Sequence, residues 1–214
     1  MSKLRLEISM SVDGYVTASG VRPEEPMGDG GQQLHEWAFG DDERGREVLA
    51  ESQRSAGASI AGRRTYDLSI PWWGADGPGG EARTPTFIVS HSTPPEVPEG
   101  GVYTFVQSPG EALTRAAAAA GGKDVDVFSA SIGQQLLRAG LVDEVRIHLV
   151  PVLLGAGTRL FENIGSDHIQ LEVLDVIEGP KGNAPAIRRH PALTPTGRAA
   201  PASWLARAGA DRHP

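Results

Sequence analysis

The chain has 214 residues, with 20 Lys and Arg side chains against 27 Asp and Glu, which gives a net charge of −7 at pH 7. This length predicts one domain, or one domain with an appendage. The hydrophobic content of 39% excludes wholesale disorder, because it suffices for an ordinary core. The absence of cysteine excludes disulfides, thiolate zinc sites and cysteine nucleophiles.

Charge, histidine spacing and hydropathy narrow the set of partners. The acidic balance argues against nucleic acid as a partner, and no apolar stretch is long enough to span a bilayer. The six histidines show no His-x₃-His spacing, so we expect no metal site. The first residues lead into a strand pattern rather than an apolar signal region. We therefore expect a cytoplasmic protein that engages neither nucleic acid nor membrane.

Composition changes abruptly at Pro180–Lys181. Residues 1–180 carry 14 basic and 26 acidic side chains, a net charge of −12, whereas residues 181–214 carry 6 basic and one acidic side chain, a net charge of +5. The second segment also holds nine Ala and five Pro, and no strand pattern is visible in it. We therefore expect a domain over residues 1–180, followed by a poorly ordered Ala/Pro/Arg-rich tail over residues 181–214.

The first part of the chain predicts strands and helices separated by long loops. Leu4, Leu6 and Ile8 alternate with polar residues, which indicates a strand with one buried face. Long loops of this kind are often lids or binding loops in compact domains. The patterns predict strands over 4–10 and 58–61, a helix over 42–55 capped by Asp41 or Asp42, a helical turn over 65–68, and loops over 18–40 and 71–85.

In the second part of the chain strands alternate with helices. This alternation predicts the α/β class, with a mixed, mostly parallel central sheet flanked by helices. The last two predicted strands have no helix between them, so we expect them to pair antiparallel. The patterns predict strands over 86–90, 101–106, 125–128, 143–154 and 169–177, and helices over 109–120, capped by Ser108, and 131–139.

Gly62-Arg63-Arg64-Thr65 follows a predicted strand and opens a predicted helical turn. Glycine lets the backbone approach a phosphate, arginine offers a fixed cationic fork, and free amides at a helix start add anion affinity. The motif therefore favours a phosphate site, and a solvated Arg-Arg pair at a helix end is the alternative. Ser90-His91 and Ser129–Gly133 follow two other strands, at the edge where open α/β sheets bind ligands.

Ser129-Ala130-Ser131-Ile132-Gly133 partly imitates the Gly-x-Ser-x-Gly nucleophile elbow, with serine at the first position. A serine hydrolase would use Ser131 as nucleophile. Serine at the start of a helix is more often a cap, so hydrolysis is kept as a third hypothesis behind those below. The candidates for its histidine are His148, His168, His190 and His213.

Asp13 ends the first strand within Ser11-Val12-Asp13-Gly14. A carboxylate there could hydrogen-bond the N–H and amino groups of a heterocycle, and an Asp in a tight turn is the alternative. Trp72 and Trp73 lie next to glycines. They either wall a ring-binding cleft or pack in the core or in a lid.

Four motifs follow one another along residues 3–180. In this order they resemble the dihydrofolate-reductase-like superfamily, in its branch similar to the C-terminal reductase domain of bifunctional riboflavin biosynthesis proteins. The resemblance implies a single domain of that fold and a homodimer; the zinc motif of a deaminase domain is absent. The motifs are Ser11–Gly14, Gly62–Tyr66, Thr86–Ser90, and the most specific, Gln134–Leu137 with Gly140-Leu141-Val142-Asp143-Glu144, Pro151–Gly157 and Leu160-Phe161.

The resemblance also implies NADPH as hydride donor and a small heterocycle as substrate, either pteridine- or pyrimidine-like or a ribosylamino-pyrimidine. In the family, Gly-Arg-x-Thr binds the NADPH phosphates, a serine after the next strand lies near the adenosine, and the turn before the following helix covers the pyrophosphate. The Asp of the first strand lies near the substrate, which makes Asp13 the expected catalytic residue. The implied cofactor residues are Gly62, Arg63, Arg64, Thr65, Ser90, Ser129, Ala130, Ser131 and Ile132.

The sequence departs from the family in two places. Phe128-Ser129 stands where the family commonly has Gly-Gly, and we expect the two Cβ atoms to crowd the pyrophosphate. After Pro180 the family continues with a strand like Val-Thr-His-Leu-Arg-Tyr, which a one-base shift in a back-translation restores. We therefore hypothesise a frameshift near codon 182, a missing strand and an exposed sheet edge. Both departures favour the alternative of a degenerate, non-catalytic nucleotide-binding protein of the same fold.

Overall fold

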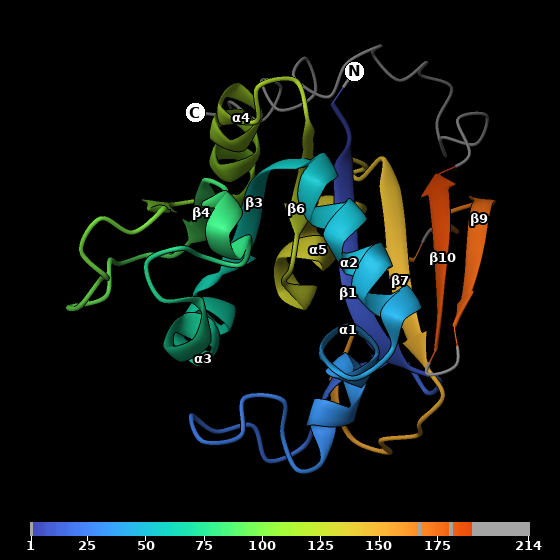
Figure 1. The fold of residues 1–214 in the computed structure, drawn as a ribbon. Helices are drawn as coiled ribbons and strands as arrows, with labels where there is room; N and C mark the ends of the chain where they lie inside the picture. Colours follow the sequence, from blue (N-terminus) through green and yellow to red (C-terminus); the bar gives the residue numbers. More distant parts are fainter. Residues whose placement is uncertain (1, 167, 180–181, 190–214) are drawn as a thin grey trace.

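A computed structural model describes residues 2–166, 168–179 and 182–189 of the chain. Its centre is an eight-stranded sheet in the order β5-β4-β3-β6-β1-β7-β10-β9 (Figure 1). Strand β2 pairs with β8 in a separate small sheet. The strands are β1 Leu4–Ser11, β2 Tyr15–Ala18, β3 Ala56–Gly62, β4 Thr86–Val89, β5 Tyr103–Val106, β6 Asp124–Val127, β7 Glu144–Val150, β8 Gly157–Arg159, β9 Leu171–Gly179 and β10 Gly182–Arg189.

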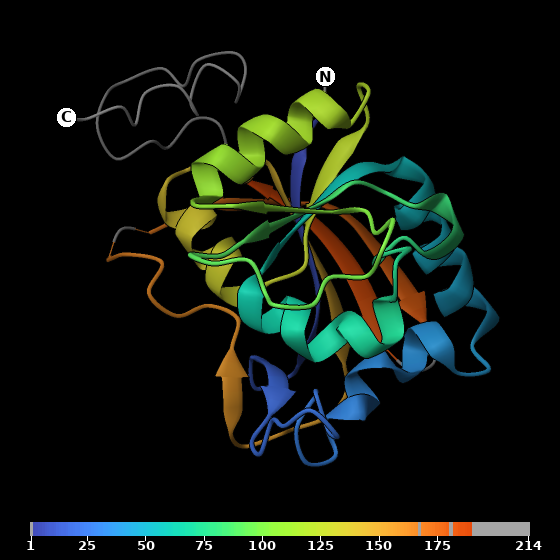
Figure 2. The ribbon, with the colours of Figure 1, turned by 90° about the vertical axis from the view of Figure 1, so that its left-hand side faces the viewer.

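Helices cover both faces of this sheet. Helices α4 and α5 pack on one face, and α1 and α2 lie on the other (Figure 2). No helix among the described residues is long and apolar enough to cross a membrane. The helices are η1 Gly31–His35, α1 Glu36–Phe39, α2 Glu43–Ser55, α3 Arg63–Trp73, η2 Gly80–Ala82, α4 Pro109–Ala119 and α5 Ala130–Arg138.

The predicted fold class is confirmed. Strands β5, β4, β3, β6, β1 and β7 run parallel, and β10 joins β7 and β9 in antiparallel pairing. The prediction that the last two strands pair with each other is wrong, because β10 lies between β7 and β9. Asp42 caps α2 by accepting from the Arg44 N–H, and Ser108 caps α4 by accepting from the Glu111 N–H.

The segment after Pro180 differs from its prediction. Residues 182–189 form β10, with Arg188 opposite Glu144 of β7 and Gly182 opposite Gly179 of β9. The expected missing strand is therefore present, and β7 is covered. Backbone hydrogen bonds to two neighbours hold this segment although its side-chain pattern does not predict a strand. Residues 190–214 of the predicted tail lie outside the described residues.

Two predicted loops contain helices. In 18–40, residues 31–39 are helical because Leu34, Trp37 and Ala38 bury against α2 and β7. In 71–85, helix α3 continues through Pro71 to Trp73, and Trp73 packs against the buried Tyr66. In both places the burial of apolar side chains in a core cluster stabilises the helix more than the local Gly and Pro residues disfavour it.

Both faces of β1 are buried, whereas the alternation predicted one. Leu4 and Leu6 face the apolar core under α4 and α5. Arg5, at 2% exposure, and Glu7, at 5%, lie on the opposite face, and Ser52 of α2 contacts both of them. Helix α2 therefore covers a charged layer, and this layer forms part of the site described below.

The docking of α2 requires a glycine at position 45. A Cβ at Gly45 would overlap the carbonyl oxygen of Trp37, where α1 meets α2. We expect Gly45→Ala to lower the free energy of unfolding by about 1–3 kcal/mol through overpacking, measured by urea denaturation. Gly110→Ala in α4 is the matched control, because nothing lies within 4 Å of a Cβ there. It is expected to stabilise by up to about 1 kcal/mol, and equal effects of the two variants would contradict this account.

Candidate active site

A cleft of about 1480 Å³ opens at the carboxyl ends of the parallel strands. Gly62 ends β3, Ser90 follows β4 and Phe128 follows β6, and all three line the cleft. Because β3 lies between β4 and β6 in parallel pairing, these chain segments meet at one edge. This is the edge at which open α/β sheets bind ligands.

The nine residues expected to bind a cofactor all line this cleft. They come from three segments that are far apart in the sequence and are brought together by the parallel strands. Their common location agrees with the sequence-based grouping, and their role in binding stays a prediction. They are Gly62, Arg63, Arg64, Thr65, Ser90, Ser129, Ala130, Ser131 and Ile132.

Two helix N-termini meet at Ser129. Helix α3 begins at Arg63 and helix α5 at Ala130. The Gly62 N–H donates to Ser129 Oγ at 3.0 Å, and the hydroxyls of Thr65 and Ser129 lie 2.6 Å apart. A Cβ on Gly62 would come within 3.0 Å of Ser129 Oγ, so glycine permits this approach. Free N–H groups and the helix dipoles make this end of the cleft attractive to anions.

The two arginines of the motif have different surroundings. Arg63 Nε donates to both carboxylate oxygens of Asp67, at 2.7 and 2.9 Å, and its Nη1 donates to the Ser92 carbonyl at 3.0 Å. Arg64 is exposed, lines the cleft, and makes no hydrogen bond or ion pair to any described residue. Arg63 therefore shapes the site with its charge already paired, and Arg64 offers an uncompensated cation.

Phe128 and Ser129 occupy the place of the expected glycine pair. Phe128 is half-buried and lines the cleft, so its ring takes up space there. Ser129 is buried, and its hydroxyl already accepts the Gly62 N–H. One backbone donor at the helix starts is consequently used within the protein.

The structure does not place a histidine as general base beside Ser131 among the described residues. Ser131 is exposed at the start of α5, and among the described residues it makes no hydrogen bond to a histidine. His148 is buried and its Nε2 is paired with Glu7. His190 and His213 lie outside the described residues. A nucleophilic serine needs a base within hydrogen-bond reach, so the described residues give this hypothesis no support.

Both tryptophans line the cleft, and a role for their rings in binding stays a prediction. Trp72 is largely exposed at the end of α3, where its ring can cover a ligand. Trp73 also packs against the cluster around Tyr66. Trp73 therefore anchors the helix end that presents Trp72.

Asp13 does not line the cleft. Its carboxylate accepts from the Leu154 N–H at 3.1 Å, the Gly155 N–H at 2.7 Å and the Ser11 hydroxyl at 2.6 Å. The Ser11 hydroxyl and these N–H groups outweigh desolvation and lower the pKa of Asp13 to about 2. The structure therefore supports the alternative reading, in which Asp13 joins the turn after β1 to the loop after β7.

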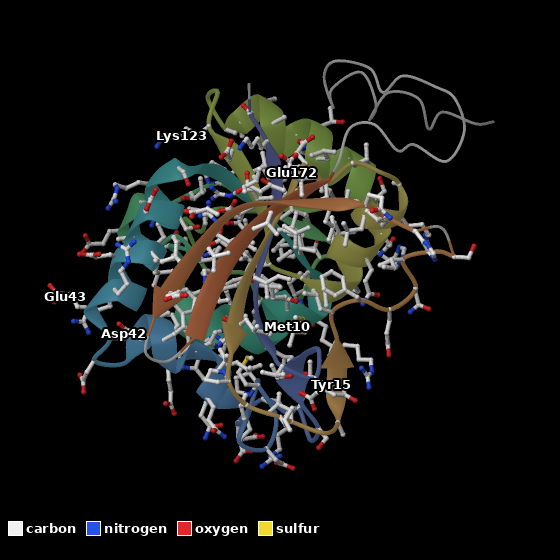
Figure 3. All side chains as sticks on the ribbon, turned by 90° about the vertical axis from the view of Figure 1, so that its right-hand side faces the viewer. Met10, Tyr15, Asp42, Glu43, Lys123 and Glu172 are labelled. Carbon is white, nitrogen blue, oxygen red and sulfur yellow. The ribbon has the colours of Figure 1, made fainter. Side chains whose placement is uncertain are left out.

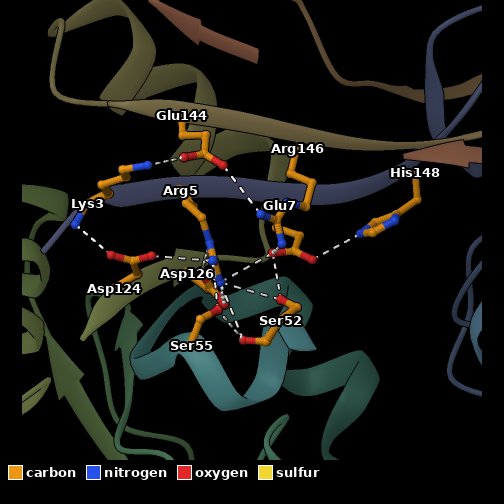
Figure 4. Close-up of polar contacts among 10 residues, drawn as sticks. All are labelled: Lys3, Arg5, Glu7, Ser52, Ser55, Asp124, Asp126, Glu144, Arg146 and His148. Carbon is orange, nitrogen blue, oxygen red and sulfur yellow. Dashed lines mark hydrogen bonds and ion pairs between the residues drawn. The ribbon is translucent and has the colours of Figure 1, made fainter. Parts of the chain in front are cut away.

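A layer of buried charges, which the sequence patterns did not predict, lies beneath α2 (Figure 4). Arg5 Nε and Nη2 donate to the two carboxylate oxygens of Asp126 at 2.8 and 2.9 Å. Glu7 accepts from the Ser52 hydroxyl at 2.7 Å and lies 3.0 Å from His148 Nε2. Glu7, Ser52, Asp126 and His148 all line the cleft. No group of described His, Asp and Glu side chains in the protein could hold a metal ion.

The pKa values of Asp126 and Glu7 shift in opposite directions, although both carboxyl groups are buried. Desolvation, reinforced by the negative charge of Glu7, raises the pKa of Asp126 to about 7, against the opposing effect of Arg5. Desolvation would also raise the pKa of Glu7, but the hydrogen bond to His148 and the charges of His148, Arg5 and Arg146 hold it below its ordinary value. Like charges in one low-dielectric layer do not ionise independently.

A signal for this layer exists in the sequence. Ionisable side chains recur with period two on three strands, and the signs are complementary between β1 and β6. They are Arg5 and Glu7, Asp124 and Asp126, and Glu144, Arg146 and His148. A strand pattern alone assigns such residues to solvent. Complementary charge on strands that are neighbours in the sheet is the feature that indicates burial.

We expect Asp13→Asn to weaken the fold and leave the cleft intact. The pKa of about 2 in the folded state lies below the ordinary value, so the carboxylate stabilises the fold at neutral pH. That stabilisation is lost as pH falls from about 4 to about 2. Urea midpoints should therefore be lower in the variant at pH 7 and converge with the wild type in acid. Unchanged midpoints with abolished turnover would instead restore a catalytic role.

Comparison with solved structures supports this fold. A protein of Shewanella sp. PV-4 that is assigned to riboflavin biosynthesis has a TM-score of 0.65 and 20% identity, over 88% of this chain and 99% of that one. The diaminohydroxyphosphoribosylaminopyrimidine deaminase/5-amino-6-(5-phosphoribosylamino)uracil reductase of Thermotoga maritima has a TM-score of 0.61 and 12% identity, over 88% of this chain and 57% of that one. At such identities the likeness shows the fold alone.

The dihydrofolate reductase of Enterococcus faecalis, in complex with NADP(H) and RAB-propyl, is also similar. Its TM-score is 0.52 at 14% identity, over 87% of this chain and 96% of that one. A search of the curated proteins found no match. The family described as RibD C-terminal domain matches residues 2–183, and the frameshift near codon 182 stays a hypothesis. The chain therefore belongs to the RibD C-terminal domain family and has a dihydrofolate-reductase-like fold.

Proposed function

We propose that the chain is an NADPH-dependent reductase of a small heterocycle, either pteridine- or pyrimidine-like or a ribosylamino-pyrimidine. One observation carries the proposal: a single cleft joins a cationic end, with Arg64 and two helix N-termini, to an end lined by buried acidic and imidazole groups. Membership of the RibD C-terminal domain family supports a reductase-like activity. The Thermotoga protein is named a reductase of 5-amino-6-(5-phosphoribosylamino)uracil, and this chain covers 57% of its length. That compound is therefore one candidate substrate here.

The residues present fit NADPH. Its phosphates need cations and free N–H donors, which Arg64 and the starts of α3 and α5 supply. When bound, NADPH supplies a hydride to a C=N or carbonyl carbon. The protein binds and orients: Arg63 fixes the Ser90–Ser92 segment, and the exposed ring of Trp72 is placed to exclude water from the cleft.

The alternative of a degenerate, non-catalytic nucleotide-binding protein keeps two observations in its favour. Ser129 Oγ takes the Gly62 N–H, and the Phe128 ring stands in the cleft. Both reduce what is available to a pyrophosphate. The altered tail no longer favours this alternative as it did, since β10 completes the sheet.

We expect Arg64→Ala to weaken NADPH binding about tenfold or more, because the variant removes an uncompensated charge from a phosphate site. Binding is measured by the quenching of Trp fluorescence and by energy transfer to the nicotinamide. NADH is titrated as the control ligand. Arg54→Ala is the matched control, because Arg54 is exposed and lies outside the cleft. Equal effects of the two variants would contradict the proposed phosphate site.

Turnover separates the reductase from its alternative. NADPH oxidation is measured with dihydrofolate and with 5-amino-6-(5-phosphoribosylamino)uracil. Consumption of NADPH with either compound supports the reductase. NADPH binding without oxidation by either compound favours the non-catalytic alternative, and no binding to folded protein contradicts both.

We also propose a cytoplasmic homodimer that uses the outer strand β9, seen at the front of Figure 3, where Glu172 is labelled. Among the described residues β9 pairs only with β10, and it exposes Leu171, Val173 and Val176. Exposed apolar edges of this kind mark association sites. Light scattering should give a dimer mass for the wild type and a monomer mass for Val173→Glu. Val97→Glu, at an exposed position outside the strands, should stay dimeric, and a monomeric wild type would overturn the proposal.

A further inference from the structure

The charges that line the cleft are divided by sign. Of the Lys and Arg side chains that the structure describes, only Arg63 and Arg64 line it, and both stand at the start of α3. The acidic side chains that line the cleft come from other elements. They are Glu7 of β1, Asp126 of β6, and Glu24 and Glu25 between β2 and η1.

The cations that accompany Glu7 and Asp126 do not line the cleft (Figure 4). Arg5 donates to both carboxylate oxygens of Asp126 at 2.8 and 2.9 Å, and Arg146 Nη1 lies 3.9 Å from Glu7 Oε2. Desolvation opposes the ionisation of Glu7. The hydrogen bond with His148 and the charge of Arg5 nevertheless hold the pKa of Glu7 below its ordinary value. Glu7 is therefore an anion at neutral pH, and this wall presents carboxylates rather than guanidinium groups to a ligand.

The segment between β2 and η1 adds further negative charge. Residues 19–30 hold one Arg, two Glu and one Asp, which leaves a net charge of −2. Arg22 is paired with Glu25 at 2.7 Å and with Asp29 at 2.6 Å, and it does not line the cleft. Glu24 is exposed and forms no hydrogen bond or ion pair with a described residue. Glu24 therefore offers the cleft a carboxylate that no arginine contacts.

Met27 holds this acidic segment on the side of the cleft where His148 lies. Its side chain packs against the buried cluster that contains Trp37. The Trp37 ring in turn stacks on His148, with centroids 3.9 Å apart and an interplanar angle of 15°. His148 Nε2 lies 3.0 Å from Glu7 Oε1. The carboxylates of the segment and of the sheet therefore border the same end of the cleft.

Two exposed aromatic rings also line the cleft. Phe39, at the end of α1, is 77% exposed, and Trp72, near the end of α3, is 63% exposed. Aromatic rings that are left outside the core offer flat apolar faces on which the ring of a planar ligand can stack. This observation is independent of the charges, and it points to a planar ligand.

We propose that the substrate is a planar heterocycle that carries no phosphate or carboxylate group. The inference rests on the proposed function, which assigns the cationic end to NADPH and leaves the acidic end to the substrate. An anionic substituent there would meet like charge inside a cleft, where repulsion is stronger than in bulk water. The N–H and amino groups of a neutral ring can instead donate to carboxylate oxygens. Both a ribosyl phosphate and a glutamate tail are therefore unfavourable.

The first test compares two pairs of compounds that share a ring and differ in charge. One pair is 5-amino-6-(ribosylamino)uracil and its 5-phosphate, and the other is 7,8-dihydrobiopterin and 7,8-dihydrofolate. In each pair that is reduced, kcat/KM from NADPH oxidation should be about tenfold or more higher for the neutral member. Raising KCl from about 20 mM to about 200 mM should increase kcat/KM of the anionic member alone, because salt screens the repulsion.

The second test reverses one charge of the acidic segment. Glu24→Arg should narrow the ratio of kcat/KM between the neutral and anionic members by about threefold or more. Glu99→Arg is the matched control, because it changes the net charge equally at an exposed position outside the cleft, between β4 and β5. The control should keep the wild-type ratio, and equal narrowing in the two variants would contradict the assignment of Glu24 to this end.

The outcomes separate this inference from the proposed function. An anionic member that is reduced as well as its neutral partner, or whose kcat/KM falls with added salt, overturns the inference and leaves the reductase intact. Calorimetric titration of the four compounds into NADPH-free protein should give the same order of affinities, whether or not NADPH is oxidised. Tighter binding of the anionic members, or no binding of any compound, also overturns it. Failure of the wild type to bind NADPH defeats the proposed function instead.

Discussion

Arg5 lies in the middle of the sheet with its guanidinium paired to both oxygens of Asp126 and close to Glu7. Removing one partner of such a buried group costs about 3–5 kcal/mol, because the remaining charge is stranded in a low dielectric. The pairing therefore constrains β1, β6 and α2 at once. β1 must lie beside β6, and α2 must bring Ser52 and Ser55 over the guanidinium. Gly45 permits the approach that closes this layer.

The same layer supplies one end of the cleft. Glu7 and Asp126 neutralise the buried Arg5, and they also line the cleft. The same two side chains therefore stabilise the fold and contact the space open to a ligand. Desolvation and the charge of Glu7 raise the pKa of Asp126 against the effect of Arg5. Desolvation acts on Glu7 as well, but His148, Arg5 and Arg146 outweigh it and lower the pKa of Glu7. At the other end, Gly62, Arg64 and Ser129 form an anion-attracting surface. The two ends suit the two halves of a hydride-transfer reaction, a phosphate-bearing donor and a heterocycle that takes a proton.

The sequence predicts most of this arrangement and misses specific parts of it. The strand periodicity and caps such as Ser108 are local signals, so the elements and the parallel sheet could be predicted. The grouping of Gly62–Thr65 with Ser129–Ile132 followed from family motifs and the rule that strand ends meet. Arg5 and Glu7 were assigned to solvent because alternation does not reveal whether a helix covers the polar face. The role of Asp13 depends on Leu154 and Gly155, about 140 residues away, and no local pattern contains that contact. Strand β10 is held by backbone pairing with β7 and β9, and its amino-acid composition shows no strand pattern from which this pairing could be predicted.

The central claim is that one cleft holds a dinucleotide phosphate at the starts of α3 and α5 and a heterocycle at the end that Glu7 and His148 line. A crystal structure of the protein with NADPH tests it most directly. The account predicts phosphate oxygens against Arg64 and the N-termini of α3 and α5, with the nicotinamide end toward Glu7 and His148. Phosphates bound elsewhere, or a nicotinamide directed away from that pair, would contradict it.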